Sequence, residues 1–108
     1  VSTFAEAFAQ GVEAVKRRGK ADAGEKTMLD VYIPVADYLK QAEANSTAWS
    51  EILEQVCATA NQGMESTRDM VATKGRASFL GERSRGHIDA GAKTAQLMIC
   101  AIASVLPK

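Results

Sequence analysis

One segment of this sequence has the residue types of an anion-binding site, the stretch KGRASFLGERSRGHIDAGA at residues 74–92. Within residues 74–90, four basic side chains outnumber two acidic ones, which leaves a formal charge of +2. The glycines allow backbone N–H groups to approach a ligand closely. The segment then leads into an apolar stretch with helical spacing, and the N-terminus of a helix favours negative charge. The pattern therefore predicts a phosphate or nucleotide site.

Other chemistry fits the spacing of this segment less well. Ser84, His87 and Asp89 are the residue types of a catalytic triad, but three residues within six positions of a glycine-rich loop cannot easily reach the separated geometry that a triad needs. His87 is the only histidine, and no cysteine pair or Asp-x-Asp cluster accompanies it, so we expect no metal site in these residues. No Walker-type loop occurs either. The catalytic residues are left unassigned.

Apolar residues at helical spacing predict the four helices that would position this segment. They are expected at residues 4–18, 28–43, 47–73 and 90–106. No strand pattern or internal repeat competes with them, so the predicted fold class is all-α, an antiparallel up-and-down helical bundle in a single domain. The last helix is apolar on most of its surface, and we expect it to be buried on several sides.

Local signals mark the ends of these helices. The capping-box spacing occurs twice, at Thr3–Glu6 and at Thr27–Asp30. Asp89 is placed to cap the last helix. Pro34 predicts either a bend in the first turn of the second helix or a helix that begins near it. Gly63 is the one weak point of the long third helix.

The composition argues against some classes of protein. Thirteen basic and thirteen acidic residues give a formal net charge of zero, which is unlike a protein that binds nucleic acid or an anionic membrane through bulk electrostatics. No stretch approaches the apolar length of a membrane span and no signal peptide is visible, so we expect a cytoplasmic protein. Cys57 and Cys100 lie in apolar helical patterns, and we expect buried, reduced thiols rather than a disulfide.

Two blocks of the sequence resemble a known family. GKADAGEKTMLDVYIPV at 19–35, followed about forty residues later by KGRASFLGERSRGHIDAGA at 74–92, closely resembles the nucleotide-binding subunit of dihydroxyacetone kinases, the DhaL family. The resemblance extends over essentially the whole chain. It implies an antiparallel barrel of about eight helices. Residues 1–108 would supply about four of them, as the C-terminal part of a DhaL-type nucleotide-binding domain.

The resemblance also implies which residues bind the nucleotide. They are Gly19, Met28, Arg76, Asp89, Ala90 and Gly91. A methionine suits an adenine face because it is apolar and polarizable, and Arg76 offers a fixed fork of donors to phosphate or ribose oxygens. Ala90 stands where the family usually has proline, which reduces loop rigidity but removes no ligand chemistry. The middle of the loop, with Arg83, Arg85 and His87, is expected to be loop architecture or a docking surface for a partner subunit.

The function implied by the resemblance is that of an ADP- or ATP-binding component of a dihydroxyacetone kinase. It would transfer a phosphoryl group to dihydroxyacetone or a related small keto-sugar, held by a dihydroxyacetone-binding kinase subunit or domain. The family's magnesium-binding aspartates are not among these residues, so Mg²⁺ ligands are expected upstream and the chain is expected to be inactive alone. The phosphoryl donor is either free ATP or a phosphotransferase-system protein.

One alternative is a non-catalytic helical module that assembles with a partner chain, because apolar faces left exposed must find partners. A homodimer is one form that such an assembly could take.

Overall fold

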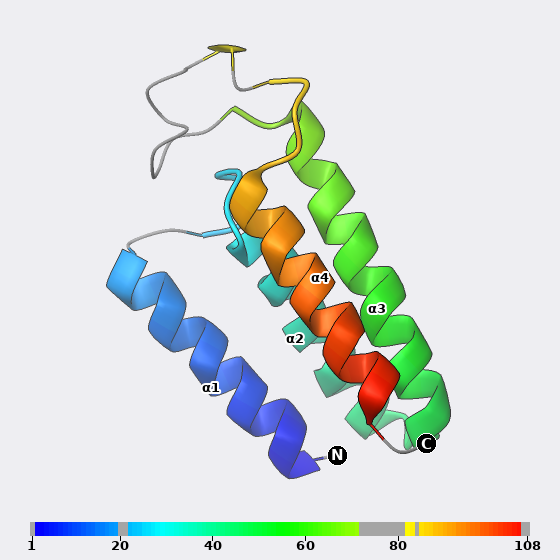
Figure 1. Cartoon of the computed structure of the whole chain (residues 1–108). Helices are drawn as coiled ribbons and strands as arrows, with labels where there is room; N and C mark the ends of the chain where they lie inside the picture. The colour runs from blue at the N-terminus through cyan, green and yellow to red at the C-terminus, as the bar shows by residue number, and fades with distance from the viewer. Residues whose placement is uncertain (1, 20–21, 72–81, 84, 107–108) are drawn as a thin grey trace.

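Four helices account for most of the chain. The computed structural model describes residues 2–19, 22–71, 82–83 and 85–106. Over these residues it contains no strand, and its elements are α1 (Ser2–Gly19), α2 (Leu29–Ala44), α3 (Trp49–Ser66), the short 3-10 helix η1 (Thr67–Asp69) and α4 (Ala90–Val105). The helices run alternately up and down (Figure 1). The predicted all-α antiparallel bundle is confirmed.

Two of the predicted helix caps are present. Thr27 Oγ1 accepts a hydrogen bond from the Leu29 amide at 3.1 Å, and Asp30 Oδ2 accepts one from the Thr27 amide at 2.9 Å. The Asp30 bond is the one expected of a capping box, whereas the Thr27 hydroxyl binds the amide of Leu29 and not that of Asp30. Asp89 Oδ2 accepts from the Ala92 amide at 2.9 Å and caps α4. The side chain of Thr3 lies outside the described part of the structure.

The third helix is shorter than its apolar pattern predicts. Instead of reaching residue 73, α3 ends at Ser66 and continues as η1 to Asp69, after which Met70 is extended with φ −88° and ψ 154°. At this ending the Thr67 carbonyl accepts from the Met70 amide at 3.1 Å, as in a 3-10 turn, and from the Lys26 ammonium at 2.6 Å.

Gly63 of α3 lies against the start of α2, one turn before Pro34. The α-helix runs through Pro34, so the alternative of a helix beginning near it is wrong. Because Pro34 has no N–H, the Asp30 carbonyl loses its usual helical donor. This carbonyl lies against Gly63, where an added Cβ would be 2.3 Å from the oxygen. Gly63 is therefore the residue that permits the close approach of α3, and not merely a weak point in it.

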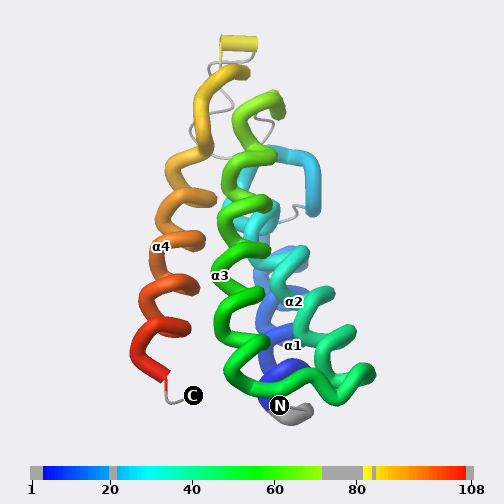
Figure 2. Tube along the Cα trace, turned by 90° about the vertical axis from the view of Figure 1, so that its right-hand side faces the viewer, coloured from blue at the N-terminus to red at the C-terminus, as the bar shows by residue number. Residues whose placement is uncertain are grey.

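The main cluster of buried apolar residues comes chiefly from α2, α3 and α4, with Ala5 from α1. In Figure 2, α3 lies between α4 and α2. α2 packs against the three other helices, and α3 packs against α2 and α4. The largest fully buried apolar side chains are Leu29, Leu39, Ile52, Val31 and Val35, all from α2 and α3. α4 contributes mainly small residues, such as Ala92 and Ala95, which bring its backbone close to its neighbours.

The outer face of α4 is not covered. Leu97, Met98 and Ile102 are about half exposed and Val105 is 79% exposed, so the expectation that α4 is buried on several sides is wrong for this chain. On α1, Phe4 and Val15 are exposed as well. None of the helices in the described ranges is long and apolar enough to cross a membrane.

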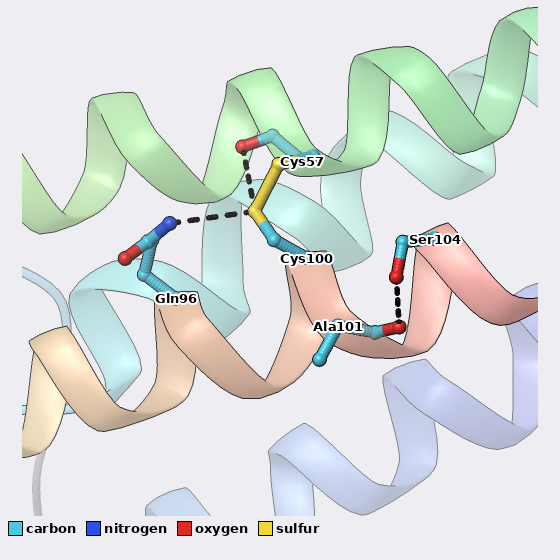
Figure 3. Close-up of a disulfide and its surroundings, with 5 residues drawn as sticks. All are labelled: Cys57, Gln96, Cys100, Ala101 and Ser104. Atoms are coloured by element: carbon cyan, nitrogen blue, oxygen red, sulfur yellow. Dashed lines mark hydrogen bonds between the residues drawn. A yellow bond between two sulfur atoms is a disulfide. The ribbon is translucent and has the colours of Figure 1, made fainter.

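Cys57 and Cys100 form a disulfide that joins α3 to α4, with their Cα atoms 4.7 Å apart (Figure 3). The expectation of reduced thiols is wrong. The cysteines are 43 residues apart, and only the packing of α3 against α4 brings them together, so neither local pattern indicates the pairing. The Gln96 side-chain amide lies 3.4 Å from Cys100 Sγ, one turn earlier on α4.

Candidate nucleotide site

The predicted site residues that the structure describes lie at one end of the bundle, where the connections between helices gather (Figure 1). Met28 directly precedes α2, and Asp89, Ala90 and Gly91 form the start of α4. Gly19 is the last residue of α1, at the same end. Arg76 lies outside the described residues, so the role expected for it stays a prediction.

Met28 and the first turn of α4 are neighbours. A Cβ added to Gly91 would lie 3.8 Å from the Met28 backbone nitrogen and 3.9 Å from Met28 Cβ. The same Cβ would lie 3.1 Å from the Asp89 carboxylate. Met28 is 43% exposed although it sits among buried residues. An exposed apolar side chain therefore stands beside a capped helix N-terminus, and a side chain at 91 would crowd the Asp89 carboxylate.

The loop before α2 is organised by the carboxylate of Asp30. Asp30 is buried, and its Oδ1 accepts from the Gly24 amide at 2.6 Å while its Oδ2 accepts from the Thr27 amide. Gly24 has φ +86°, a conformation that favours glycine. These contacts explain the local sequence GEKTMLD in physical terms, because the carboxylate at its end folds the loop over the start of α2 and sets the position of Met28. From the sequence, Asp30 was expected only to cap the helix.

Lys26 is a buried residue of the same loop that sequence reasoning missed. Its ammonium donates to the carbonyl oxygens of Thr67, at 2.6 Å, and of His87. Burial lowers the pKa of Lys26, and the nearby Asp89 and Asp69 carboxylates oppose that shift. A lysine in a loop is usually exposed, so its residue type gave no sign that Lys26 is buried. The one sequence signal of its importance was that it lies inside the family-like block 19–35.

Thr67 joins the end of α3 to the start of α4. Its hydroxyl donates to the Met64 carbonyl at 2.7 Å and accepts from the Asp89 amide at 3.0 Å. Thr67 is fully buried. The backbone at Asp89 is therefore held by a side chain from η1 in addition to the cap it forms.

The described part of the basic loop is also tied to η1. Arg85 donates to the Asp69 carbonyl at 2.8 Å and pairs with Glu82 at 3.1 Å. The hydrogen bond and charge of Arg85 lower the pKa of Glu82. The Gly86 amide donates to the Arg68 carbonyl at 2.6 Å. Arg85 thus belongs to loop architecture, one of the two roles expected for it.

The chemistry of this corner favours an uncharged part of a ligand. Asp89 already occupies the Ala92 amide and brings its own negative charge to the helix N-terminus, which makes the first turn of α4 a poorer phosphate site than the sequence suggests. This arrangement suits a ligand that has both a flat ring and hydroxyl groups. The ring would pack on the exposed methionine, and the hydroxyl groups would donate hydrogen bonds to the carboxylate. Across the described ranges, no group of three His, Cys, Asp or Glu side chains is arranged to hold a metal ion.

Comparison with known proteins gives the family. Residues 1–104 match the DAK2 domain. The chain is 44% identical over 92 residues, 85% of its length, to the PEP-dependent dihydroxyacetone kinase, ADP-binding subunit DhaL, of Escherichia coli. It is 42% identical over 84 residues, 78% of its length, to the ADP-binding subunit DhaL of a PTS-dependent dihydroxyacetone kinase of Lactococcus lactis. The chain belongs to the DAK2 domain family.

The aligned part is less than half of these relatives. It covers 44% of the Escherichia coli subunit and 38% of the Lactococcus lactis subunit. A longer relative, an L-erythrulose 1-kinase of Mycolicibacterium smegmatis, is 33% identical over 103 residues, which is 95% of this chain and 18% of that protein. These relatives are named for kinases of two different substrates, dihydroxyacetone and L-erythrulose.

Proposed function

We propose that this chain is the nucleotide-binding part of a dihydroxyacetone-type kinase, and that Met28 and Asp89–Gly91 hold the nucleoside end of ADP or ATP. The observation that carries the proposal is the proximity of Met28 to Gly91, two residues 63 positions apart that the family resemblance assigned to one pocket: a Cβ added at 91 would lie 3.8 Å from the Met28 backbone nitrogen. Relatives named as ADP-binding subunits support the choice of ligand.

The residues present fit a nucleoside better than they fit a phosphate chain. The Met28 side chain would pack on the adenine ring, and the Asp89 carboxylate would accept hydrogen bonds from ribose hydroxyls. Ala90 and Gly91 carry little or no side chain, so a ligand could approach the helix backbone there. Gly19 would leave similar space at the end of α1, and Arg76 would bind ribose or phosphate oxygens.

The reaction would need groups beyond these residues. We propose that the chain is the C-terminal part of a DhaL-type domain, that the Mg²⁺ ligands come from the preceding half, and that the chain is inactive without it. Two features support this: the chain spans less than half of its DhaL relatives, and α1 and α4 expose apolar side chains where further helices could pack.

The phosphoryl acceptor and the phosphoryl donor of the reaction are proposed from the family and from the names of the relatives. A phosphoryl group would pass to dihydroxyacetone or a related small keto-sugar on a partner subunit or domain. The two relatives named as DhaL subunits belong to PEP- or PTS-dependent kinases, which favours a phosphotransferase-system donor over free ATP.

Binding of Mg-ADP to paired methionine variants tests the site. Met28 and Met98 are 43% and 48% exposed, and Met98 lies on the open face of α4, which makes it a matched control. By isothermal titration, Met28→Ala should weaken Mg-ADP binding by about tenfold, whereas Met98→Ala should leave the affinity within about twofold. Equal affinities of the two variants would contradict the proposed pocket.

The exposed face of α4 favours a second candidate, a non-catalytic assembly module. Four apolar side chains in one helix, Leu97, Met98, Ile102 and Val105, are more than an isolated domain usually exposes together. In this case the chain would form a homodimer or a complex in sedimentation experiments, Met98→Lys would disrupt it, and Mg-ADP would not raise the melting temperature.

A further inference from the structure

Lys26 is an unusual residue for the place it occupies. Of the basic side chains that the structure describes, it alone is buried, with 3% of its surface exposed. Removing an ammonium group from water is costly unless hydrogen bonds and nearby negative charge replace the lost hydration. A loop residue next to solvent has no packing reason to accept this cost, so the burial calls for an explanation in terms of what the ammonium holds.

The ammonium joins two segments that are remote from it in sequence. It donates to the carbonyl of Thr67, 41 residues away at the end of α3, and to that of His87, 61 residues away before α4. The C-terminal end of a helix carries partial negative charge, which favours a cation at Thr67. The Asp89 and Asp69 carboxylates add attraction, and Arg68 and Arg85 oppose it.

Each of these contacts leads to a residue of the proposed site. The Thr67 carbonyl accepts a hydrogen bond from the Lys26 ammonium, and the Thr67 hydroxyl accepts one from the Asp89 amide. His87 is two residues before Asp89, and Lys26 is itself two residues before Met28. The same side chain therefore determines the relative position of Met28 and of the first turn of α4.

We propose that Lys26 is a positioning residue for the nucleotide: its ammonium ties the loop that carries Met28 to the loop that carries Asp89, and so holds the two walls of the pocket together without touching the ligand. The inference rests on the proposed function for the identity of the ligand. The link between the two loops can be tested without any ligand.

Amide hydrogen exchange in the full chain, measured residue by residue by NMR, tests this link. In Lys26→Met, which keeps the side-chain length but cannot donate a hydrogen bond, the amides of Asp89 and Ala92 should exchange at least about tenfold faster than in the wild type. Leu39→Ala is the control, since it removes buried atoms from α2 away from the loops. It should lower the melting temperature and leave those two amides within about threefold.

Two results would overturn the proposal. One is an unchanged exchange rate at Asp89 and Ala92 in Lys26→Met, and the other is an equal acceleration at both amides in Leu39→Ala. Lys26→Arg keeps the charge and the donors, so it should exchange more slowly than Lys26→Met at these positions. It also serves as the test variant if Lys26→Met does not fold, and a tenfold acceleration in Lys26→Arg would then count against the proposal.

Titration with Mg-ADP separates this inference from the proposed function. If Met28→Ala weakens binding and Lys26→Met does not, the pocket is right and the positioning role is wrong. If Met28→Ala has no effect on Mg-ADP, the proposed pocket is wrong, while the exchange data still decide whether Lys26 couples the two loops.

Discussion

The two ends of the bundle are built from different kinds of contact. At the loop end, charged groups determine the geometry: the buried Lys26 and Asp30 each bind two backbone groups, and the partly buried Asp89 caps α4. At the opposite end the contacts are apolar, with Phe4 6.3 Å from Trp49 between ring centroids. An apolar cavity of about 170 Å³ lies among the four helices there, next to Leu106.

The polar contacts at the loop end fix the positions of the loops, whereas the apolar contacts at the opposite end mainly stabilise the fold. Hydrogen bonds to a buried charge are directional, and leaving one partner unsatisfied is costly, so few alternative arrangements of the loop end have similar energy. Apolar contacts are non-directional and tolerate a partly filled space. A binding site that needs Met28 and Gly91 close together is therefore expected at the polar end, which is where they lie.

The largest expected effect comes from the disulfide, which joins α3 to α4 between the two ends. The Cys57→Ser/Cys100→Ser double variant should lose about 3 to 4 kcal/mol of unfolding free energy, because the bridge closes a long loop. Urea denaturation measures this loss, and dithiothreitol should bring the wild type to the same value without affecting the double variant.

The loop end should nevertheless keep its local order when the disulfide is removed. Lys26 ties the end of α3 to the segment before α4 independently of the cysteines. Selective acceleration of amide exchange at Asp89 in the double variant would show that the two ends are not separable.

A smaller effect is expected from a methyl group at the crossing of α2 and α3. Gly63→Ala places a Cβ against the Asp30 carbonyl and the Val31 Cα, so it should cost about 2 kcal/mol and disturb the loop that Asp30 holds. Gly11→Ala is the matched control on α1, where a Cβ meets nothing within 4 Å. That variant should gain about 0.5 kcal/mol by helix propensity. Thermal unfolding measures the stabilities of Gly63→Ala and Gly11→Ala. Equal stabilities of the two variants would contradict the close approach of α3 to α2 at Gly63.

The smallest effect is a pH dependence at the loop end. Burial lowers the pKa of Lys26 below its ordinary value of 10.5, so between the two values the unfolded chain binds more protons than the folded chain. The free energy of unfolding contributed by Lys26 should therefore rise with pH as 10.5 is approached. Urea denaturation of the wild type and of Lys26→Met, from pH 7 to 9.5, isolates the contribution; a difference that falls with pH would have the wrong sign.

Much of the fold could be predicted because its signals are local. Apolar spacing located the four helices, and the caps at Thr27 and Asp89 were found because their donors and acceptors lie within three residues. The end of the third helix could not be found this way. Its apolar pattern continues past Asp69, whereas in the structure the Thr67 carbonyl binds the Met70 amide and the ammonium of a lysine 41 residues earlier in the chain.

The candidate site stays a prediction. The resemblance assigned Met28 and Asp89–Gly91 to one pocket, and in the fold Met28 lies near Gly91. Lys26 and Thr67 were missed because their importance depends on partners that only the folded chain provides. Nothing in the described residues tests Arg76, and its role stays a prediction.

The sequence by itself determined the helices, most of their ends and the family to which the chain belongs, since these depend on periodicity, short-range hydrogen bonds and an ordered set of motif residues. Tertiary structure alone decided the pairing of Cys57 with Cys100, the burial of Lys26 and the use of Gly63 as a contact. The physical reason is the same in each case. A disulfide, a buried ammonium and a close backbone contact each need a partner from another helix, and only packing brings that partner within reach.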